Sequence, residues 1–415
     1  MENVITDVKR NSLLAVVLDR LARPKRALEM TWRHRRSLEY IRKRFGWKMW
    51  WNTIFVYWFI RGDDCGQGVI DPIFKFFPWL APKNPWDIEI EITTACYGKC
   101  IMCEHTYWRD KSYLDRHMTF EQFKHIIDQF PSLKWINITG EGSPFLNPDF
   151  LKMLEYCKTK NIFVSFAYDF HLYNENIGRK LIELGIDKLW ISFDGGTKEV
   201  YEQVRPTFNF NNVIKNIKAF IELKKKMKSP LPEICFRYTV MTVNKDDCIK
   251  FLELVNTLGD KEWMGDDTYV NFVSLLEFEE TKHLIYEPTE EDLDKVMEKG
   301  KELNIKVLWS HPSHDESKKP PMDWCVCWTE PYIMINGDIV PDCGVLMSNK
   351  RPFLHKNAFG NLLKQSFREI WDSERYRKFR KMVVDPKGKV PIFCDGCRGF
   401  NSTERKRKYG VSESI

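Results

Sequence analysis

The sequence predicts an α/β fold organised around a parallel sheet. Short β-branched runs alternate with longer helical patterns from Trp86 to about Leu308, and a repeated strand–helix order is typical of parallel βα units. The chain has 415 residues, enough for one barrel-sized domain and smaller additions. We expect the barrel over residues 86–317, an N-terminal helical segment over 1–85 and a separate C-terminal domain over 318–415.

The elements of the expected barrel follow from these runs. Strands are expected at 88–92, 135–139, 162–166, 188–193, 234–242, 270–273 and 305–308. Helices are expected at 119–129, 148–159, 176–184, 210–227, 245–258 and 290–303. Parallel barrels carry their chemistry at the carboxyl ends of the strands, so the loops that follow the strands should contain the functional residues.

The segment 1–85 is basic and aromatic. Its first fifty residues hold thirteen Lys and Arg against five Asp and Glu. The apolar run at 47–60 contains Lys48 and Asn52 and is shorter than the roughly 20 residues that span a bilayer. Two alternatives are open for this segment: a helix on an anionic membrane surface, or a cap packed against the barrel. A nucleic-acid arm is disfavoured, because the aromatic residues form one apolar block.

The twelve cysteines are expected to be reduced thiols in a cytoplasmic protein. If the N-terminal segment binds a membrane, we expect it to do so at the cytoplasmic face. The first twenty residues carry charges such as Asp7, Lys9 and Asp19 and lack the apolar core of a signal peptide.

Three cysteines directly after the first expected strand predict an iron–sulfur cluster. Cys96, Cys100 and Cys103 have the spacing C-x-x-x-C-x-x-C. Three thiolates can hold three irons of a [4Fe–4S] cluster, and the lack of a fourth nearby cysteine leaves one iron open to a small molecule. The alternative is a structural zinc site that uses His105 as its fourth ligand.

This cysteine spacing resembles that of the radical S-adenosylmethionine (SAM) superfamily. The resemblance implies a partial (βα)6 TIM-like barrel, SAM bound at the open iron, and reductive cleavage of SAM to a 5′-deoxyadenosyl radical that abstracts hydrogen from a substrate. It also implies a low-potential electron donor of the flavodoxin or ferredoxin type.

Four later features are similar to SAM-binding motifs of that superfamily and fall near expected strand ends. Thr139 to Pro144 resembles the motif that contacts the SAM amino group, and Ser192 to Gly196 resembles a motif that contacts the ribose or methionyl part. Arg205, which precedes Pro206, and Arg237, on the fifth expected strand, complete the set. The residues implied as SAM contacts are Gly140, Glu141, Ser192, Asp194, Arg205 and Arg237.

A second cysteine set follows the Pro-rich stretch at 318–321. A hairpin is expected at 332–341 with its turn at Asn336-Gly337, followed by Gly360-Asn361-Leu362, a helix at 366–371 and a C-x-x-C pair. This order resembles the SPASM/twitch extension of radical SAM enzymes, which implies an auxiliary [4Fe–4S] cluster, although a zinc ribbon has similar cysteines. The implied ligands are Cys343, Cys394, Cys397 and either Cys325 or Cys327.

The substrate is the least constrained part of the expectation. The basic aromatic arm favours a lipid-linked or membrane-associated substrate. A dehydrogenase of a cyclitol or sugar and a peptide-maturation enzyme are alternatives within the same superfamily. A non-catalytic iron–sulfur or zinc scaffold is the alternative from a different class.

Overall fold

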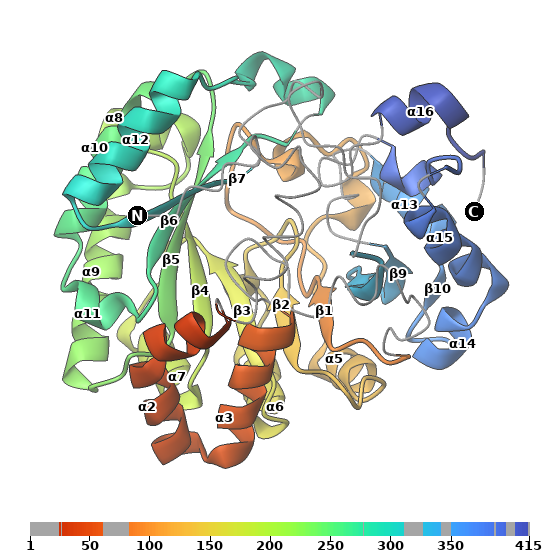
Figure 1. Ribbon diagram of the computed structural model, residues 1–415, viewed down its shortest axis with the longest axis horizontal. Helices are drawn as coiled ribbons and strands as arrows, with labels where there is room; N and C mark the ends of the chain where they lie inside the picture. Colours follow the sequence, from red (N-terminus) through yellow and green to blue (C-terminus); the bar gives the residue numbers. More distant parts are fainter. Residues whose placement is uncertain are drawn as a thin grey trace.

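A computed structural model describes residues 25, 27–60, 83–276, 278–310, 327–341, 350–385, 387–395 and 403–413. One ten-stranded sheet runs through the molecule in the order β10-β9-β8-β1-β2-β3-β4-β5-β6-β7 (Figure 1). Strands β1 to β7 are parallel to their neighbours. The strands are β1 (Asp87–Ile90), β2 (Trp135–Ile138), β3 (Phe163–Tyr168), β4 (Lys188–Ser192), β5 (Glu233–Val240), β6 (Tyr269–Ser274), β7 (Lys306–Ser310), β8 (Tyr332–Ile333), β9 (Asp338–Val340) and β10 (Gly360–Asn361).

Helices follow the barrel strands in alternation, so the predicted α/β fold with a parallel sheet is confirmed. The seven expected strands and six expected helices are present, with ends shifted by up to three residues. The helices are α2 (Arg35–Phe45), α3 (Trp47–Phe55), α5 (Phe120–Ile127), α6 (Phe150–Thr159), α7 (Glu175–Leu184), α8 (Lys198–Val204), α9 (Phe210–Lys226), α10 (Cys248–Thr257), α11 (Lys261–Met264), α12 (Glu290–Glu302), α13 (Arg351–Asn357), α14 (Phe367–Trp371), α15 (Glu374–Val384) and α16 (Thr403–Tyr409).

The two faces of the barrel sheet differ in polarity because successive side chains of a strand point to opposite faces. On the face toward the helices, Ile90, Ile138 and Phe166 belong to the main hydrophobic core. On the other face, the Asn137 amide donates to Glu89 Oε1 at 2.7 Å, and the Ser165 hydroxyl donates to Asn137 Oδ1 at 3.0 Å. The sheet therefore has a polar concave side suited to a polar ligand.

A C-terminal hairpin extends the barrel sheet beyond β1. Strand β8 pairs in parallel with β1, and β9 pairs antiparallel with β8 and with β10. The predicted hairpin turn at Asn336-Gly337 is confirmed, since Gly337 has a φ of +86° and its N–H donates to Met334 O at 2.8 Å. The predicted domain boundary at residue 317 stays a prediction, and main-chain pairing joins the segments on its two sides.

The N-terminal helices lie across the amino ends of the barrel strands (Figure 1). His34 lies 3.3 Å from Glu233 Oε1 at the start of β5, and the Tyr57 ring contacts Phe163 at the start of β3 with centroids 5.8 Å apart. The Asn52 amide donates to Lys134 O at 2.8 Å, just before β2. The inner side of this segment therefore forms the cap that the sequence left as one of two alternatives.

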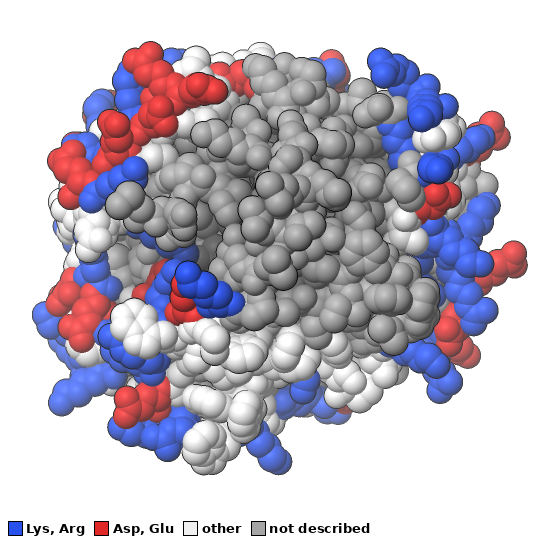
Figure 2. Space-filling model, in the orientation of Figure 1, with Lys and Arg blue, Asp and Glu red and all other residues white. Residues whose placement is uncertain are grey.

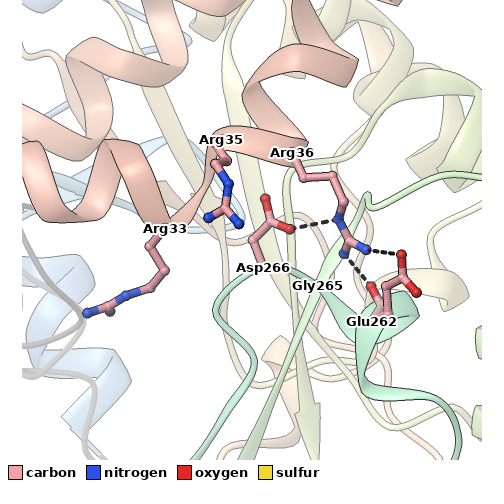
Figure 3. A pocket seen from close by; sticks show the side chains of 6 residues that line it. All are labelled: Arg33, Arg35, Arg36, Glu262, Gly265 and Asp266. Atoms are coloured by element: carbon pink, nitrogen blue, oxygen red, sulfur yellow. Dashed lines mark hydrogen bonds and ion pairs between the residues drawn. The ribbon is translucent and has the colours of Figure 1, made fainter.

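Ion pairs fasten the N-terminal helical segment to α11 and to the loop before β6. Arg36 lies between Asp266, at 2.8 Å, and Glu262, at 3.1 Å, in the pocket between α2 and this loop (Figure 3). Arg33 pairs with Asp267 at 3.1 Å. Part of the N-terminal positive charge is therefore neutralised by the barrel.

The outer side of the same helices keeps large apolar side chains in solvent. The exposed fractions are 69% for Trp32, 57% for Trp47 and 61% for Trp51. Arg35 lies over the Trp32 ring at 4.3 Å, and Arg42 lies over the Trp47 ring at 5.2 Å. Among the described residues, none of the helices is both long and apolar enough to cross a bilayer.

We predict that the cap binds most tightly at low pH through His34. Burial lowers the pKa of His34. The negative charge of Glu233 and the hydrogen bond that this carboxylate accepts from His34 outweigh burial and leave the pKa raised above 6.5. The stabilisation is therefore complete below about pH 6.5, the pKa of the unfolded chain, and is lost as pH rises through the raised folded-state pKa. His34→Gln should lower the melting temperature more at pH 5.5 than at pH 8.

The exposed His125 on α5 provides the matched control. His125→Gln should leave the melting temperature unchanged at both pH values in the same circular-dichroism melts. An equal loss at both pH values for His34→Gln would contradict the ion pair.

Candidate functional site

The cysteine loop begins just after the carboxyl end of β1. Its entry is held by a bridge between Thr93 and His117, and the Gly98 N–H donates to Cys96 Sγ at 3.2 Å. The Ile101 N–H donates to Val204 O at 3.1 Å, which ties the loop to the end of α8. The fold thus brings the loop to the edge of the barrel where parallel sheets carry their active sites.

The three thiols lie close enough to influence one another and are largely buried. Burial raises the pKa of Cys100 to about 11, with the neighbouring Cys96 adding to the rise. Burial also raises the pKa of Cys103 well above 9, and the charges of Cys100 and Cys96 contribute. Only the thiolate binds a metal, so these groups need a strong local cation to deprotonate, as iron would provide. The donor set therefore fits a [4Fe–4S] cluster.

The zinc alternative is judged by the spacing of the possible donor groups. His105 is buried with its Nε2 2.9 Å from Thr94 O, and its Nδ1 has no hydrogen-bond partner among the described residues. Within the described ranges, no three His, Cys, Asp or Glu side chains converge closely enough to hold a single metal ion. A bridged cluster of several irons spreads its cysteine ligands further apart than one tetrahedral zinc does.

Arg205 lies beside the cysteine loop. Its Nη1 lies 3.7 Å from Cys100 Sγ, and its Nε donates to Asp194 Oδ2 at 2.6 Å. The other Asp194 oxygen accepts the Thr239 N–H at 2.6 Å, and Asp194 is only 1% exposed. Both carboxylate oxygens are therefore engaged, and Asp194 anchors Arg205. The SAM contact expected of Asp194 from the sequence stays a prediction.

Ser192 and Arg237 face each other across neighbouring strands. They are register partners in β4 and β5, and the Arg237 guanidinium lies over the Trp190 ring at 4.9 Å. Among the described residues neither side chain makes a hydrogen bond or ion pair with another side chain, and Arg237 is exposed. Their polar atoms remain available to a ligand at the mouth of the barrel.

Gly140 brings the loop after β2 against β1. Its φ is +153°, and a Cβ atom at this position would lie 2.7 Å from Glu91 Cγ. The next residue, Glu141, has two charged neighbours. Its carboxylate lies 3.5 Å from Arg351 Nε and close to the Glu104 side chain. Burial raises the pKa of Glu141 to about 8, although Arg351 opposes the shift.

Arg351, on α13 of the C-terminal segment, was not predicted from the sequence. Its Nη1 donates to Glu91 Oε2 at 3.0 Å, a second nitrogen contacts Glu91 Oε1, and its guanidinium lies over the Trp108 ring at 4.4 Å. Glu91 also accepts the Ile335 N–H at 3.2 Å. No local pattern marks Arg351, because its partner is 260 residues away in the chain.

Asp169 is a second residue that sequence reasoning missed. It follows β3, accepts a hydrogen bond from the Ser143 hydroxyl at 3.4 Å, and raises the pKa of Cys96 in addition to the effect of burial. Its position directly after a strand was the available signal, because that is where parallel barrels carry functional side chains.

The predicted ligands of the second cluster are only partly described. Cys394 ends a short helical turn at Ile392–Cys394 and is buried. Cys327 begins the turn Cys327–Thr329. Cys325, Cys343 and Cys397 lie outside the described residues, so this ligand set stays a prediction.

Two family matches agree with this arrangement. Residues 90–255 match the Radical SAM superfamily, and residues 325–398 match the SPASM iron–sulfur cluster-binding domain. The "Tungsten-containing aldehyde ferredoxin oxidoreductase cofactor-modifying protein" of Pyrococcus furiosus is 24% identical over 318 residues, which cover 70% of this chain and 82% of that protein. The "AdoMet-dependent heme synthase" of Methanosarcina barkeri is 26% identical over 343 residues, covering 74% and 89%.

Solved structures share the fold at low identity. Streptococcus suis SuiB superposes with a TM-score of 0.56 at 13% identity, covering 80% of this chain and 77% of its own. The structure of anSMEcpe with bound AdoMet and a peptide gives a TM-score of 0.53 at 18% identity, covering 79% and 91%. With a SAM-binding [4Fe–4S] cluster and an auxiliary cluster as its cofactors, this chain belongs to the radical SAM superfamily and carries a C-terminal SPASM domain.

Proposed function

We propose that Cys96, Cys100 and Cys103 hold the cluster at which this enzyme binds and cleaves SAM. The observation that carries the proposal is the placement of three free thiols, one buried and two half-buried, on the loop after β1, with Arg205 Nη1 3.7 Å from Cys100 Sγ. When bound, the cluster supplies one electron that splits SAM into methionine and a 5′-deoxyadenosyl radical, which abstracts hydrogen from the substrate.

The chain's own residues would position SAM in this scheme. Gly140 lets the backbone approach closely, while Ser192 and Arg237 offer a hydroxyl and a guanidinium to the polar groups of SAM. Asp194 acts through Arg205 and is a positioning residue. We propose that Cys394, Cys397 and Cys343, with either Cys325 or Cys327, hold the auxiliary cluster.

Two substrate classes have support. The names of the relatives at 24% and 26% identity, a cofactor-modifying protein and a heme synthase, favour a cofactor or cofactor precursor. A peptide is the competing class, because solved neighbours were captured with peptides.

The exposed Trp32, Trp47 and Trp51 beside Arg35 and Arg42 favour a substrate met at an anionic membrane surface. We propose the membrane surface as the place where the enzyme works.

We predict that two clusters account for about eight irons per chain, and that the first cysteine set holds half of them. Cys96→Ala/Cys100→Ala/Cys103→Ala should lower the iron content to about four and abolish formation of 5′-deoxyadenosine after anaerobic reduction with dithionite. Iron analysis and chromatography of the nucleoside provide the two measurements.

Cys157→Ala is the matched control, because Cys157 is buried in the core on α6. It should keep full iron content and nucleoside formation. Zinc in place of iron at the first three cysteines, or 5′-deoxyadenosine formed by the triple variant, would overturn the assignment.

We predict that Arg205 tunes the first cluster. A nearby positive charge stabilises the reduced, more negative cluster, so Arg205→Met should shift its midpoint potential to more negative values in a redox titration followed by electron paramagnetic resonance. Loss of such a supporting contact should slow 5′-deoxyadenosine formation by about 10–100-fold. Arg205→Lys should restore part of the potential, and Arg179→Met, a change on the surface of α7, should alter neither measurement.

We predict that the three exposed tryptophans mediate binding to anionic membranes. The variant Trp32→Ser/Trp47→Ser/Trp51→Ser should co-sediment less with phosphatidylserine vesicles than the unchanged protein, because exposed aromatic rings insert at the headgroup level. Its melting temperature should be nearly unchanged, since these rings are more than half exposed. Equal sedimentation of both proteins would contradict membrane binding through these tryptophans, and the N-terminal helices would then serve only as the cap of the barrel.

A further inference from the structure

A second basic surface lies at the other end of the chain. Residues 350–413 contain seventeen Lys and Arg but only seven Asp and Glu, although the whole chain has a formal net charge of only +6. Blue side chains predominate over α15 and α16 at the right of Figure 2. The C-terminal segment is therefore, like the first fifty residues, much more basic than the chain as a whole.

The exposed cations of this surface are brought together by a buried arginine. Arg405 on α16 donates to Gly388 O at 2.7 Å and Lys389 O at 3.0 Å, and it also donates to Met382 O near the end of α15. These bonds join α15, the loop 385–390 and α16 into one face. We name this face the C-terminal basic patch; its exposed members are Lys378, Lys381, Lys387, Lys389, Arg407 and Lys408.

The six cations of the patch are not neutralised by ion pairs. In the described part of the chain none of its six members forms an ion pair. Asp385, the acidic residue beside it, accepts the backbone N–H of Lys387 at 2.9 Å. The large exposed apolar side chains of the described residues all lie elsewhere, four of them at or near the N-terminal helices. The patch therefore lacks the aromatic rings that membrane insertion and base stacking use.

The patch adjoins the segment that carries Cys394. Val390 bridges to Val411, and the Ile392 N–H donates to the Ser412 hydroxyl at 3.1 Å. Burial lowers the pKa of Arg405, and the nearby Asp385 and Cys394 oppose this shift. The patch is thus joined by main-chain contacts to the segment that carries a cysteine of the SPASM match.

We propose that the C-terminal basic patch is the docking surface for an acidic electron-transfer protein that delivers its electron at the auxiliary cluster. This inference rests on the proposed function. One electron leaves the reduced cofactor of the donor and lowers the charge of the auxiliary cluster by one; no bond forms or breaks.

An acidic redox protein fits the patch better than a permanent partner would. Electron-transfer encounters are short-lived and bury little surface, so they rely on complementary charge, which raises association rates about 10–1000-fold and weakens with salt. A patch of cations without apolar side chains has the composition that such an encounter needs. A vesicle or a nucleic acid is the competing occupant, and the experiment includes both.

The test compares a protein donor with a chemical one. An acidic flavodoxin, photoreduced to its hydroquinone, is mixed anaerobically with the loaded enzyme, and its oxidation is followed by absorbance at low ionic strength. Lys381→Glu/Lys387→Glu/Lys389→Glu and, separately, Arg407→Glu/Lys408→Glu should each slow this oxidation at least about tenfold, and the difference should shrink in high salt. Calorimetric titration of the unreduced proteins should show weaker binding for both variants.

Reduction by dithionite separates this proposal from the proposed function. Both variants should form 5′-deoxyadenosine with dithionite as fast as the unchanged enzyme, and a failure of the unchanged enzyme in that assay would refute the proposed function instead. The control Lys215→Glu/Lys218→Glu reverses two exposed cations on α9 and should keep the full rate with flavodoxin. The proposal is overturned by an unchanged flavodoxin rate in both patch variants, or by patch-dependent binding to phosphatidylserine vesicles or to an oligonucleotide in place of flavodoxin.

Discussion

The buried ion pair between Glu91 and Arg351 is the constraint on which the rest of the arrangement depends. Glu91 is fully buried just after β1, and Arg351 reaches it from α13. The same carboxylate receives the Ile335 N–H, and Gly140 must lack a side chain to make room for it. Removing one member of such a pair leaves an uncompensated charge that costs about 3–5 kcal/mol. One carboxylate therefore fixes the cysteine-loop strand, the loop after β2 and the SPASM segment relative to one another.

Arg205 and Asp194 form a second buried ion pair, next to the cysteine loop. Two guanidinium nitrogens of Arg205, Nε and Nη2, contact the Asp194 carboxylate, and the third, Nη1, points toward Cys100. The planar fork of arginine suits this task, because it presents several donors in a rigid geometry and keeps its charge when buried. Within the predicted SAM motif at Ser192 to Gly196, the Ser192 side chain is thus half-buried and the Asp194 carboxylate is buried against Arg205.

Much of the fold and the first cysteine set could be predicted because their signals are local. The alternation of buried strands and amphipathic helices fixes the parallel sheet, and Gly337 marks the hairpin turn. The surroundings of Glu141 and the presence of Arg351 in the site could not be predicted, because both depend on partners far away in sequence. The contact of Asp194 with Arg205 spans only 11 residues, but no local pattern marks the two as a pair. The N-terminal segment shows a third case. Its composition allowed a cap or a membrane surface, and in the structure its inner side forms the cap while Trp32, Trp47 and Trp51 are exposed.

The cap also limits how molecules can reach the polar concave side of the sheet. The described N-terminal residues cover the amino ends of three barrel strands. His34 contacts β5, Asn52 contacts the residue before β2, and Tyr57 contacts β3. These contacts favour entry and exit at the opposite rim, past the cysteine loop. A bulky guest would consequently present its far end to the outside while its near end is held, and only the portion that reaches inward would be open to attack.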